Sequence, residues 1–228
     1  MKKIGVIADP HGNLSALEAV LEDMPKVDRI ICAGDLVGYG PQPNEVIDLV
    51  KSKDILSVLG NHDYAVYQEK TGSLNKLAAK VAEWTHENLE KENLRFLGKL
   101  PKKTKIEEKY EIFIAHGTPR KPLKEYLYPN VSNRNLVKMT QGTDTDIIVL
   151  GHTHIPLEKM IQGKLILNPG AVGQPRDRNP KASYMVLKLG RKKEVIQNRV
   201  SYDIEKTEKK INELELPEKF GTRLHFGW

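Results

Sequence analysis

Short apolar runs alternate with amphipathic segments in the first sixty residues. Between the runs, residues 14–24 and a segment opened by Pro43 repeat their apolar positions with the period of a helix, and Asn13 suits the N-cap of the first helix. Strands that alternate with helices predict an α/β fold with a mostly parallel sheet. The runs, each of a length typical of a buried strand, are residues 4–8, 28–33 and 55–59.

The pattern changes after residue 64. Apolar positions recur at helical spacing to about residue 100, and no strand-like run interrupts them. We therefore predict a helical insertion over about 64–100, a candidate lid, with His86 on its outer surface. Its apolar stripe consists of Leu74, Leu77, Ala78, Val81, Trp84 and Leu89.

The second half of the chain returns to strands. Residues 106–115 predict a pair of strands, residues 118–130 an ordered loop with three prolines, and residues 132–139 a helix that leads to a strand at 147–150. Short apolar runs separated by turn residues then predict an antiparallel meander between residues 157 and 200.

A charged helix near 203–214 and a tail that extends to residue 228 close the sequence. No repeat or linker divides the chain, so we predict a single domain over residues 1–228, with the C-terminal helix and tail over about 203–228. The apolar residues of the tail must be buried either on the same chain or in a homo-oligomer. They are Phe220, Leu224, Phe226 and Trp228.

The composition is that of an ordinary globular protein with a mildly basic charge. Of the 228 residues, 39% are hydrophobic and 29% charged, and the formal net charge is +6. The 30 acidic residues favour a solvated surface over a nucleic-acid-binding stripe, although the positive charge suits an anionic ligand. Cys32 is the only cysteine, and the N-terminal apolar run stops at Asp9, too early for a signal peptide or a membrane span. We therefore expect a cytoplasmic protein without a membrane partner.

Chemically reactive side chains follow five of the predicted strands. Each apolar run leads directly to an Asp or His beside a Gly. In open α/β sheets, ligands bind where the strands end at their carboxyl edge, so the five motifs together predict one site. They are Asp9-Pro10-His11-Gly12, Gly34-Asp35, Gly60-Asn61-His62-Asp63, His116-Gly117 and Gly151-His152-Thr153-His154.

The donor atoms of these motifs favour a pair of divalent metal ions. Two Asp, one Asn and five of the seven His, with no thiolate, suit Mn²⁺, Fe, Zn²⁺, Co²⁺ or Ni²⁺ rather than a structural zinc or a calcium ion. The set exceeds the needs of one tetrahedral ion, so we expect two ions about 3.5–4 Å apart. Residues i and i+2 of an extended segment point to one side, so Asp9 and His11 should share an ion, and His152 and His154 a cavity.

Asp35 is the best-placed carboxylate to bridge two such ions. Two divalent ions, the carboxylates of Asp9 and Asp35, and a bridging hydroxide leave a net positive charge. That charge attracts a phosphodiester anion, and the ions acidify the attacking water. The expected substrate is therefore a phosphoester.

The series of motifs from Asp9 to His154 resembles the calcineurin-like metallophosphoesterase family. Where the protein-phosphatase branch of that family carries Asp-Arg-Gly, this chain has Gly38-Tyr39-Gly40, which argues against a phosphoprotein substrate. Two further stretches resemble a bacterial and archaeal branch that includes small phosphodiesterases and diadenosine-polyphosphate hydrolases. They are residues 34–41 and residues 168–177.

The resemblance implies a four-layer α/β/β/α sandwich with the dimetal site at the edge of two facing sheets. It also implies that His62 contacts the phosphate and protonates the leaving oxygen instead of binding metal, and Asp63 is placed to influence His62. The ions, with Mn²⁺ as the first choice, would be held by Asp9, His11, Asp35 and His154 for one, and by Asp35, Asn61, His116 and His152 for the other.

Three further features have weaker signals. Arg176 is a candidate substrate-binding residue, because a guanidinium matches phosphate oxygens, and an ion pair with Asp177 is an equal alternative. The Tyr39 ring is able to stack on a nucleobase, but we favour the alternative that it packs beside the glycine-rich turn. Residues 168–170 indicate a turn that shapes the site from behind.

We therefore expect a dimetal-dependent phosphoesterase that hydrolyses phosphodiester or phosphoanhydride bonds of small nucleotides by attack of a metal-bound hydroxide. Dinucleotide polyphosphates are the leading substrate class. A nuclease of the same fold is a second hypothesis, but it needs a basic, aromatic-lined groove that the sequence does not place near the motifs. A non-catalytic metal-binding scaffold is a third, and the intact motif series argues against it.

Overall fold

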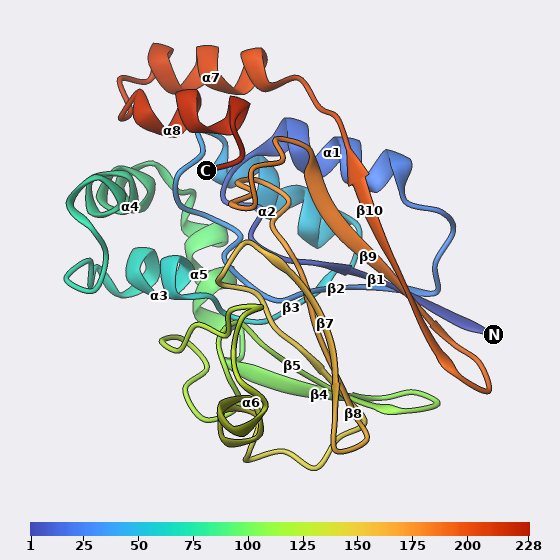
Figure 1. Ribbon diagram of the computed structural model, residues 1–228. Helices are drawn as coiled ribbons and strands as arrows, with labels where there is room; N and C mark the ends of the chain where they lie inside the picture. The colour runs from blue at the N-terminus through green and yellow to red at the C-terminus, as the bar shows by residue number, and fades with distance from the viewer.

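The computed structural model describes residues 1–228 and contains two five-stranded sheets (Figure 1). The first has the order β10-β9-β1-β2-β3 and the second the order β4-β5-β6-β8-β7. The first sheet comprises β1 (Lys2–Ile7), β2 (Arg29–Cys32), β3 (Leu56–Ser57), β9 (Ala182–Leu189) and β10 (Lys193–Val200). The second comprises β4 (Lys103–Glu107), β5 (Glu111–Ala115), β6 (Ile147–Val149), β7 (Pro156–Ile161) and β8 (Lys164–Pro169).

Eight helices surround these sheets. The segments predicted to be helical near residues 14, 43, 133 and 204 are all helices, and the Asn13 side chain caps the first by accepting a hydrogen bond from the Ala16 amide at 3.2 Å. The helices are α1 (Leu14–Asp23), α2 (Pro43–Ser52), α3 (Asn61–Gln68), α4 (Lys76–Asn88), α5 (Lys91–Lys99), α6 (Asn133–Met139), α7 (Ile204–Glu213) and α8 (Lys219–Thr222), followed by a 3₁₀ turn, η1 (Arg223–His225).

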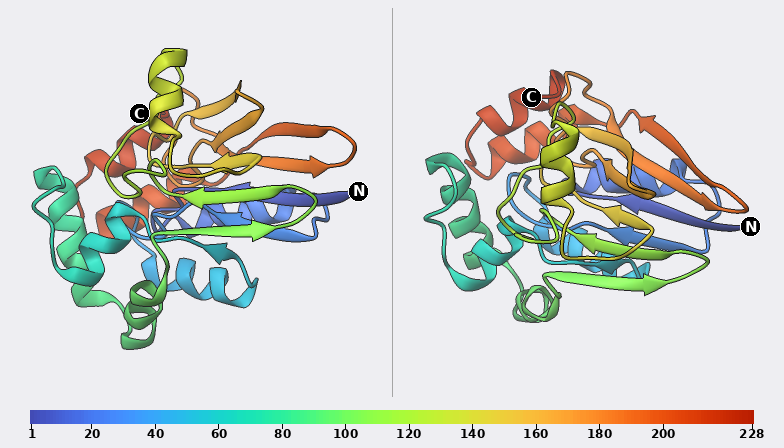
Figure 2. Two further views of the ribbon diagram at one scale, coloured as in Figure 1. Left: turned by 90° about the horizontal axis from the view of Figure 1, so that it is seen from below. Right: turned by 60° about the horizontal axis from the view of Figure 1, so that its bottom comes forward.

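Parallel pairing brings the strand ends that carry the motifs together. β1, β2 and β3 are parallel in the first sheet, and β5, β6 and β8 are parallel in the second. Their carboxyl ends lie at the end of the molecule where α3 and α4 gather, opposite the N-terminus (Figure 2). The motifs that follow these strands therefore meet at one edge.

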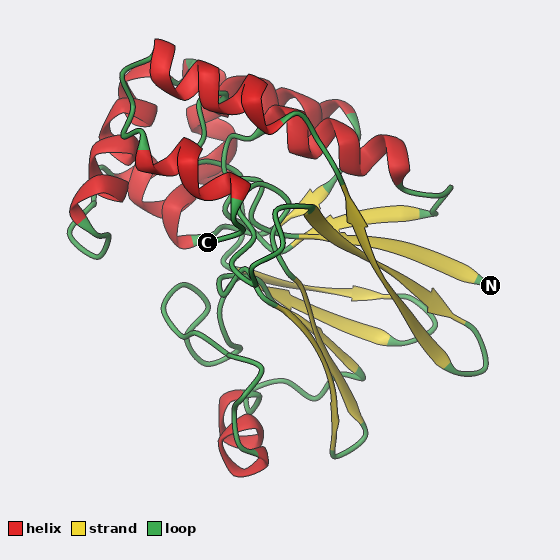
Figure 3. Cartoon of the chain, turned by 45° about the horizontal axis from the view of Figure 1, so that its top comes forward, coloured by secondary structure: helices red, strands yellow, loops and turns green.

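Side chains alternate between two cores along each strand. Val6 of β1 and Ile112 of β5 point between the sheets, while their neighbours Ile7 and Phe113 point outward. The outward core of the first sheet is covered by α1 and α2, and that of the second by α6 (Figure 3). The predicted four-layer α/β/β/α sandwich is confirmed.

The helical insertion begins three residues earlier than predicted. Gly60 precedes α3, and the Asp63 carboxylate accepts a hydrogen bond from the Gly60 amide at 2.9 Å, which stabilises the start of the helix at Asn61. The sequence lacks a Ser, Thr, Asp or Asn in the cap position, so the motif resembled a loop. The His86 side chain is 25% exposed: its Nε2 lies 3.4 Å from the exposed Glu69 carboxylate, and its Nδ1 lies 2.9 Å from the Val66 carbonyl oxygen.

The insertion is packed on two sides. Val66, Ala82 and Leu97 belong to the core that contains α1 and α2, and Val81 belongs to a smaller core with Phe220 of the C-terminal segment. These contacts favour a fixed wall beside the strand ends over the lid that the sequence suggested.

The four strands between residues 156 and 200 do not form the single antiparallel meander that we predicted. β7 pairs with β8 in the second sheet, whereas β9 pairs with β10 in the first. The chain therefore crosses between the sheets over residues 170–181. Two hairpins in different sheets have the same alternating pattern as one continuous meander, so the pattern does not distinguish them.

The C-terminal tail divides into a buried and an exposed part. Phe220 and Leu224 are buried on their own chain, while Phe226 and Trp228 are 51% and 60% exposed and pack against each other with ring centroids 5.1 Å apart. No helix is long and apolar enough to cross a membrane.

Candidate metal centre

Five of the predicted metal ligands adopt a left-handed backbone conformation. The φ angles are 54° at Asp9, 49° at His11, 55° at Asp35, 72° at His152 and 60° at His154. The expectation that Asp9 and His11 lie in an extended segment was therefore wrong. Such conformations are costly for residues other than glycine and concentrate at functional sites.

Hydrogen bonds between motifs hold these turns. The Asp9 amide donates to the Gly34 carbonyl at 3.0 Å, and the His11 amide donates to the Asp35 carbonyl at 3.0 Å. The His152 amide lies 3.2 Å from the nearer Asp9 carboxylate oxygen. The end of β1 is thereby joined to the loop after β2 and to the loop after β6 of the facing sheet.

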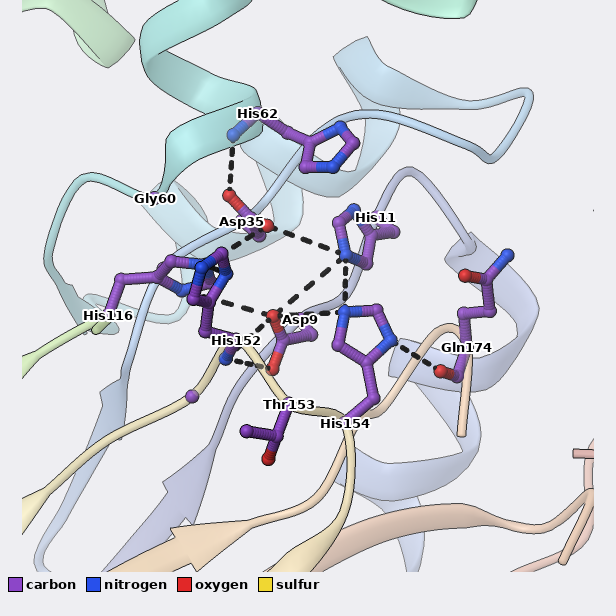
Figure 4. Close-up of polar contacts among 12 residues, drawn as sticks. Asp9, His11, Asp35, Gly60, His62, His116, His152, Thr153, His154 and Gln174 are labelled. Carbon is purple, nitrogen blue, oxygen red and sulfur yellow. Dashed lines mark hydrogen bonds and ion pairs between the residues drawn. The ribbon is translucent and has the colours of Figure 1, made fainter. Parts of the chain in front are cut away.

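The turns collect the candidate ligands into two buried groups that share Asp35 (Figure 4). Within each group the donor atoms lie within 4.8 Å of one another. His152 and His154 fall into different groups, so they share the site but not the same donor cluster. One group contains Asp9, His11, Asp35 and His154, and the other contains Asp35, His116 and His152.

Three histidines have their ring nitrogens oriented by backbone carbonyl groups. Nδ1 lies 3.0 Å from the Val37 oxygen in His11, 2.9 Å from the Ala33 oxygen in His116 and 2.6 Å from the Gln174 oxygen in His154. A carbonyl accepts only from an N–H, so Nδ1 carries a proton, and in the neutral ring Nε2 is left with a lone pair. This is the tautomer that a metal ligand requires.

The Nε2 atoms point toward one another and toward Asp35. Nε2 of His11 lies 3.1 Å from Nε2 of His154, and Nε2 of His116 lies 2.9 Å from Nδ1 of His152. The Asp35 Oδ2 is 3.1 Å from the His116 Nε2 and 3.6 Å from the His11 Nε2. Lone-pair donors that face each other at these distances fit divalent cations between them.

Asn61 completes the second group. Its Oδ1 lies 3.0 Å from the His116 Nε2, and its backbone begins α3 directly after β3. The structure thus brings together all seven predicted metal ligands.

Charges at the centre are strongly coupled. Burial raises the pKa of Asp9 to about 8. Burial also tends to raise the pKa of Asp35, but the facing imidazoles of His116 and His62 outweigh it and hold that pKa well below its usual range. For His116 burial opposes the charged form, yet Asp35 and Asp9 raise its pKa to about 9.

His62 lies beside the two groups without joining either. Its amide donates to the Asp35 Oδ1 at 2.8 Å, and its ring is 4.9 Å from that of His11 at an angle of 84°. The ring packs against Gly38, where a Cβ would come within 2.6 Å of the His62 Nδ1. That Nδ1 is buried without a hydrogen-bond partner, and burial lowers the pKa of His62 to about 4. Because the buried Nδ1 faces Gly38, contact with a ligand is left to the other ring nitrogen, Nε2.

Residues 1–192 match the calcineurin-like phosphoesterase superfamily domain. The chain belongs to this superfamily. An uncharacterized protein of Methanocaldococcus jannaschii is 40% identical to this phosphoesterase over 98% of each chain. The phosphodiesterase YfcE of Escherichia coli is 27% identical over 82% of this chain and 88% of that protein. The crystal structure of a metallophosphoesterase from Sphaerobacter thermophilus matches with a TM-score of 0.87 and 37% identity over 100% of this chain and 99% of that one. The protein is a metal-dependent phosphoesterase, and its fold implies divalent metal ions at the buried His and Asp groups.

Asp63 of this phosphoesterase acts on the backbone, not on His62 as expected. Its two oxygens accept hydrogen bonds from the Val37 amide at 3.1 Å and the Gly60 amide at 2.9 Å. The side chain is fully buried, and burial raises its pKa to about 7. Asp63 therefore joins the loop after β2 to the start of α3 through backbone amides.

We expect Asp63→Ala to destabilise the protein by about 2–4 kcal/mol, because two buried amides lose their acceptor. Urea unfolding followed by circular dichroism measures this loss. Asp48→Ala, which removes an exposed carboxylate from α2, should change the free energy of unfolding by less than about 0.5 kcal/mol. An equal effect of the two substitutions would contradict this role.

Arg176 lies at the rim of the centre and does not pair with Asp177. Its guanidinium donates to the Tyr39 hydroxyl at 3.0 Å and to the Gln174 side-chain oxygen at 3.1 Å, and it has no carboxylate partner. Asp177 pairs with Arg199 instead. Tyr39 is buried, as favoured, with its ring 4.6 Å from His11 and 4.5 Å from His62.

Sequence reasoning missed two residues near the centre. Tyr126 stacks on His152 with ring centroids 3.6 Å apart and an angle of 16°. Arg223, from η1, lies with its guanidinium carbon 6.0 Å from the centroid of the Tyr39 ring. Neither residue belongs to a motif. The only available signals were the aromatic content of the loop at 118–130 and an arginine in the tail.

Residues 168–170 support the site from behind, as predicted, but Asn168 and Pro169 are the last residues of β8, and the chain turns only from Gly170. Asn168 donates to the Gly151 carbonyl at 2.6 Å and to the Thr153 hydroxyl at 3.0 Å. It accepts from the Gly170 amide at 2.9 Å. These bonds fix the loop that carries His152 and His154.

Metal binding should release protons at neutral pH. The raised pKa values mean that Asp9 and His116 of the metal-free protein hold protons at pH 7 and lose them as the pH rises through about 8 and about 9, respectively. Affinity for Mn²⁺ should therefore rise as the pH increases from 7 to 9. Calorimetry in two buffers with different ionisation enthalpies measures the release. Equal release at pH 7 and pH 9.5 would contradict the prediction.

Proposed function

We propose that this phosphoesterase hydrolyses phosphodiester or phosphoanhydride bonds of small nucleotides, with dinucleotide polyphosphates as the leading class, in the cytoplasm. Two divalent ions, Mn²⁺ first, would be held by the seven ligands described above. The observation that carries the proposal is that Asp35 belongs to both donor groups, which are completed by oriented histidines. The name of the related phosphodiesterase YfcE supports the reaction class.

Two ions bound there would neutralise the phosphate oxygens and acidify the attacking water. The chain itself supplies orientation. Asp35 is held by the His62 amide, so the residue proposed to bridge the ions and the residue proposed to contact the phosphate are coupled. His62 is neutral in the free protein, because its pKa is about 4. A bound phosphate would raise that pKa, so that His62 donates a proton toward the leaving oxygen.

Two arginines beside Tyr39 favour a substrate with more than one negative charge. Arg176 and Arg223 lie with their guanidinium carbons 5.5 and 6.0 Å from the centroid of the Tyr39 ring. Neither pairs with an Asp or Glu side chain, although the Arg223 Nε donates to the Trp228 main-chain oxygen at 2.6 Å. Burial, together with the charge of Arg176, lowers the pKa of Arg223. An anion such as a phosphate would relieve this repulsion.

We expect Arg176→Ala to raise KM at least about tenfold, since a charge-assisted hydrogen bond contributes about 1.5–3 kcal/mol. Arg176→Lys should restore only part of the affinity, because an ammonium cannot bind two oxygens in a fork. Arg191→Ala, an exposed residue in the β9–β10 turn, is the control and should leave KM unchanged. An unchanged KM in Arg176→Ala would remove this residue from the substrate site.

The test is turnover of the Mn²⁺-loaded protein on an aryl phosphodiester, an aryl phosphomonoester and diadenosine tetraphosphate. Preferred cleavage of the dinucleotide would support the proposal, and cleavage of aryl diesters alone would contradict the substrate class. Faster cleavage of single-stranded DNA with a steep salt dependence would favour a nuclease. No turnover with any metal, despite two bound ions, would favour a scaffold.

A further inference from the structure

A cavity adjoins the second donor group. Its volume is about 580 Å³, within the range of small-molecule sites, and two proposed metal ligands, Asn61 and His152, form part of its wall. Hollows of similar volume beside Asp28 and Lys105 lie at the opposite ends of the strands and touch no proposed ligand. The cavity next to the metal centre is lined by Asn61, Tyr64, Ser73, Lys102, Leu123, Lys124, Tyr126 and His152.

Separate parts of the chain build this cavity. Tyr64 comes from α3, Lys102 from the segment before β4, and Lys124 and Tyr126 from the loop between β5 and α6. That loop lies below α3 in Figure 1, on the side of the molecule where the strands end. The fixed insertion and the ordered loop thus face each other across the entrance to the centre.

The aromatic lining is held in place by stacking. Tyr126 packs on His152, and on its loop it is nearly parallel to Tyr128, with centroids 5.8 Å apart and an angle of 10°. Even so, Tyr126 remains 42% exposed. An exposed ring with a fixed orientation loses little conformational freedom when a planar ligand stacks on it.

The charge of the lining is positive. Lys102 lies with its Nζ 5.5 Å from the centroid of the Tyr64 ring, and neither Lys102 nor Lys124 pairs with a carboxylate. No acidic residue lines the cavity. A ligand that matches this surface is both planar and anionic.

We propose that this cavity is a nucleotide subsite, in which a nucleobase stacks on Tyr126 and Tyr64 while Lys102 and Lys124 attract the phosphate. The inference rests on the proposed function and extends it: the scissile phosphate lies at the metal centre, and the attached nucleoside occupies the cavity. The volume and the two lysines suit one nucleotide unit, whereas a polynucleotide would need a longer basic groove.

The test compares the binding of AMP and ribose 5-phosphate to the Mn²⁺-loaded protein by calorimetry. The two probes share the phosphate and the sugar, so the ratio of their dissociation constants isolates the base. Wild type should bind AMP at least about fivefold more tightly, as expected for one base–aromatic stack. Tyr126→Ala should bring the ratio near one, and Tyr126→Phe should keep it.

Lysine variants separate charge from stacking. Lys102→Ala should weaken both probes and leave their ratio unchanged. Lys193→Ala is the matched control, because this lysine lies 5.1 Å from the centroid of the Tyr110 ring, away from the centre, and should change neither constant. If Tyr126→Ala loses metal or fails to fold, Tyr64→Leu provides the second test, with the same expected fall in the ratio.

A wild-type ratio near one, or a ratio that both tyrosine substitutions leave unchanged, would overturn the subsite. So would an affinity that rises steadily with the length of an oligonucleotide. None of these readouts depends on hydrolysis. Hydrolysis of phosphoesters together with a ratio of dissociation constants near one would support the proposed function and contradict the subsite. The expected ratio without any turnover would contradict the proposed function alone.

Discussion

Asp35→Asn should lower kcat/KM by about a thousandfold or more, equivalent to about 4 kcal/mol of transition-state stabilisation. Asp35 is the only carboxylate shared by the two donor groups, and its Oδ2 lies 3.1 Å from the His116 Nε2. An amide has the same shape but no negative charge, and it presents only one oxygen to two cations. Phosphodiester turnover and metal content at matched protein concentration measure the effect.

The substitution should also reduce the number of bound ions, since the remaining ligands lose the charge that offsets cation repulsion. Asp28→Asn is a matched control at the opposite end of β2, where the carboxylate accepts a hydrogen bond from the Lys3 amide. It should retain both ions and full activity. Wild-type turnover in Asp35→Asn would contradict a bridging role.

His62→Ala should lower kcat by about 10²- to 10⁴-fold while leaving the metal content unchanged. The ring lies beside the donor groups and outside them, and its Nδ1 faces Gly38, which leaves Nε2 for the phosphate. Removal of the ring should therefore abolish the contact with the phosphate and the leaving oxygen, while all metal-binding side chains remain. Steady-state kinetics and metal analysis of the same preparation separate these effects.

His86→Ala is the control, because that histidine also lies in the insertion but contacts the Val66 carbonyl away from the centre. It should keep wild-type kcat. If His62→Ala lost its ions, His62 would be a structural support of the centre. If it kept full kcat, the proposed contact with the phosphate would be wrong.

The predictable part of the fold came from periodicity and strand order. Runs such as residues 28–33 are long enough to identify buried strands, and parallel strands must end at one edge. The proximity of Asp9 and Asp35 follows from that rule, whereas His116 follows β5 of the facing sheet. The four-layer architecture with two facing sheets was not predicted from periodicity; it was implied by the resemblance to the phosphoesterase family, which the family match and the sheet topology bear out.

The geometry within the motifs was not predictable in this way. Asp9 and His11 were expected to point to one side of an extended segment, whereas both have positive φ. Their conformation depends on hydrogen bonds to residues 34 and 35, which lie in the loop after β2. Local spacing contains no information about such partners.

The sequence pattern also did not indicate which residues surround the metal centre. Tyr126 reaches His152 from an irregular loop, and Arg223 reaches Tyr39 from the last residues of the chain. Neither contact follows from a hydrophobic period. These long-range contacts place an aromatic and a basic side chain beside the metal centre, where no sequence motif indicated them.

The most direct measurement of the central claim is electron paramagnetic resonance of the protein during titration with Mn²⁺, combined with elemental analysis. The account predicts two ions per chain that are magnetically coupled, because a shared Asp35 would hold them about 3.5–4 Å apart. Saturation at a single ion, or two ions with uncoupled spectra, would contradict a dimetal centre bridged by Asp35.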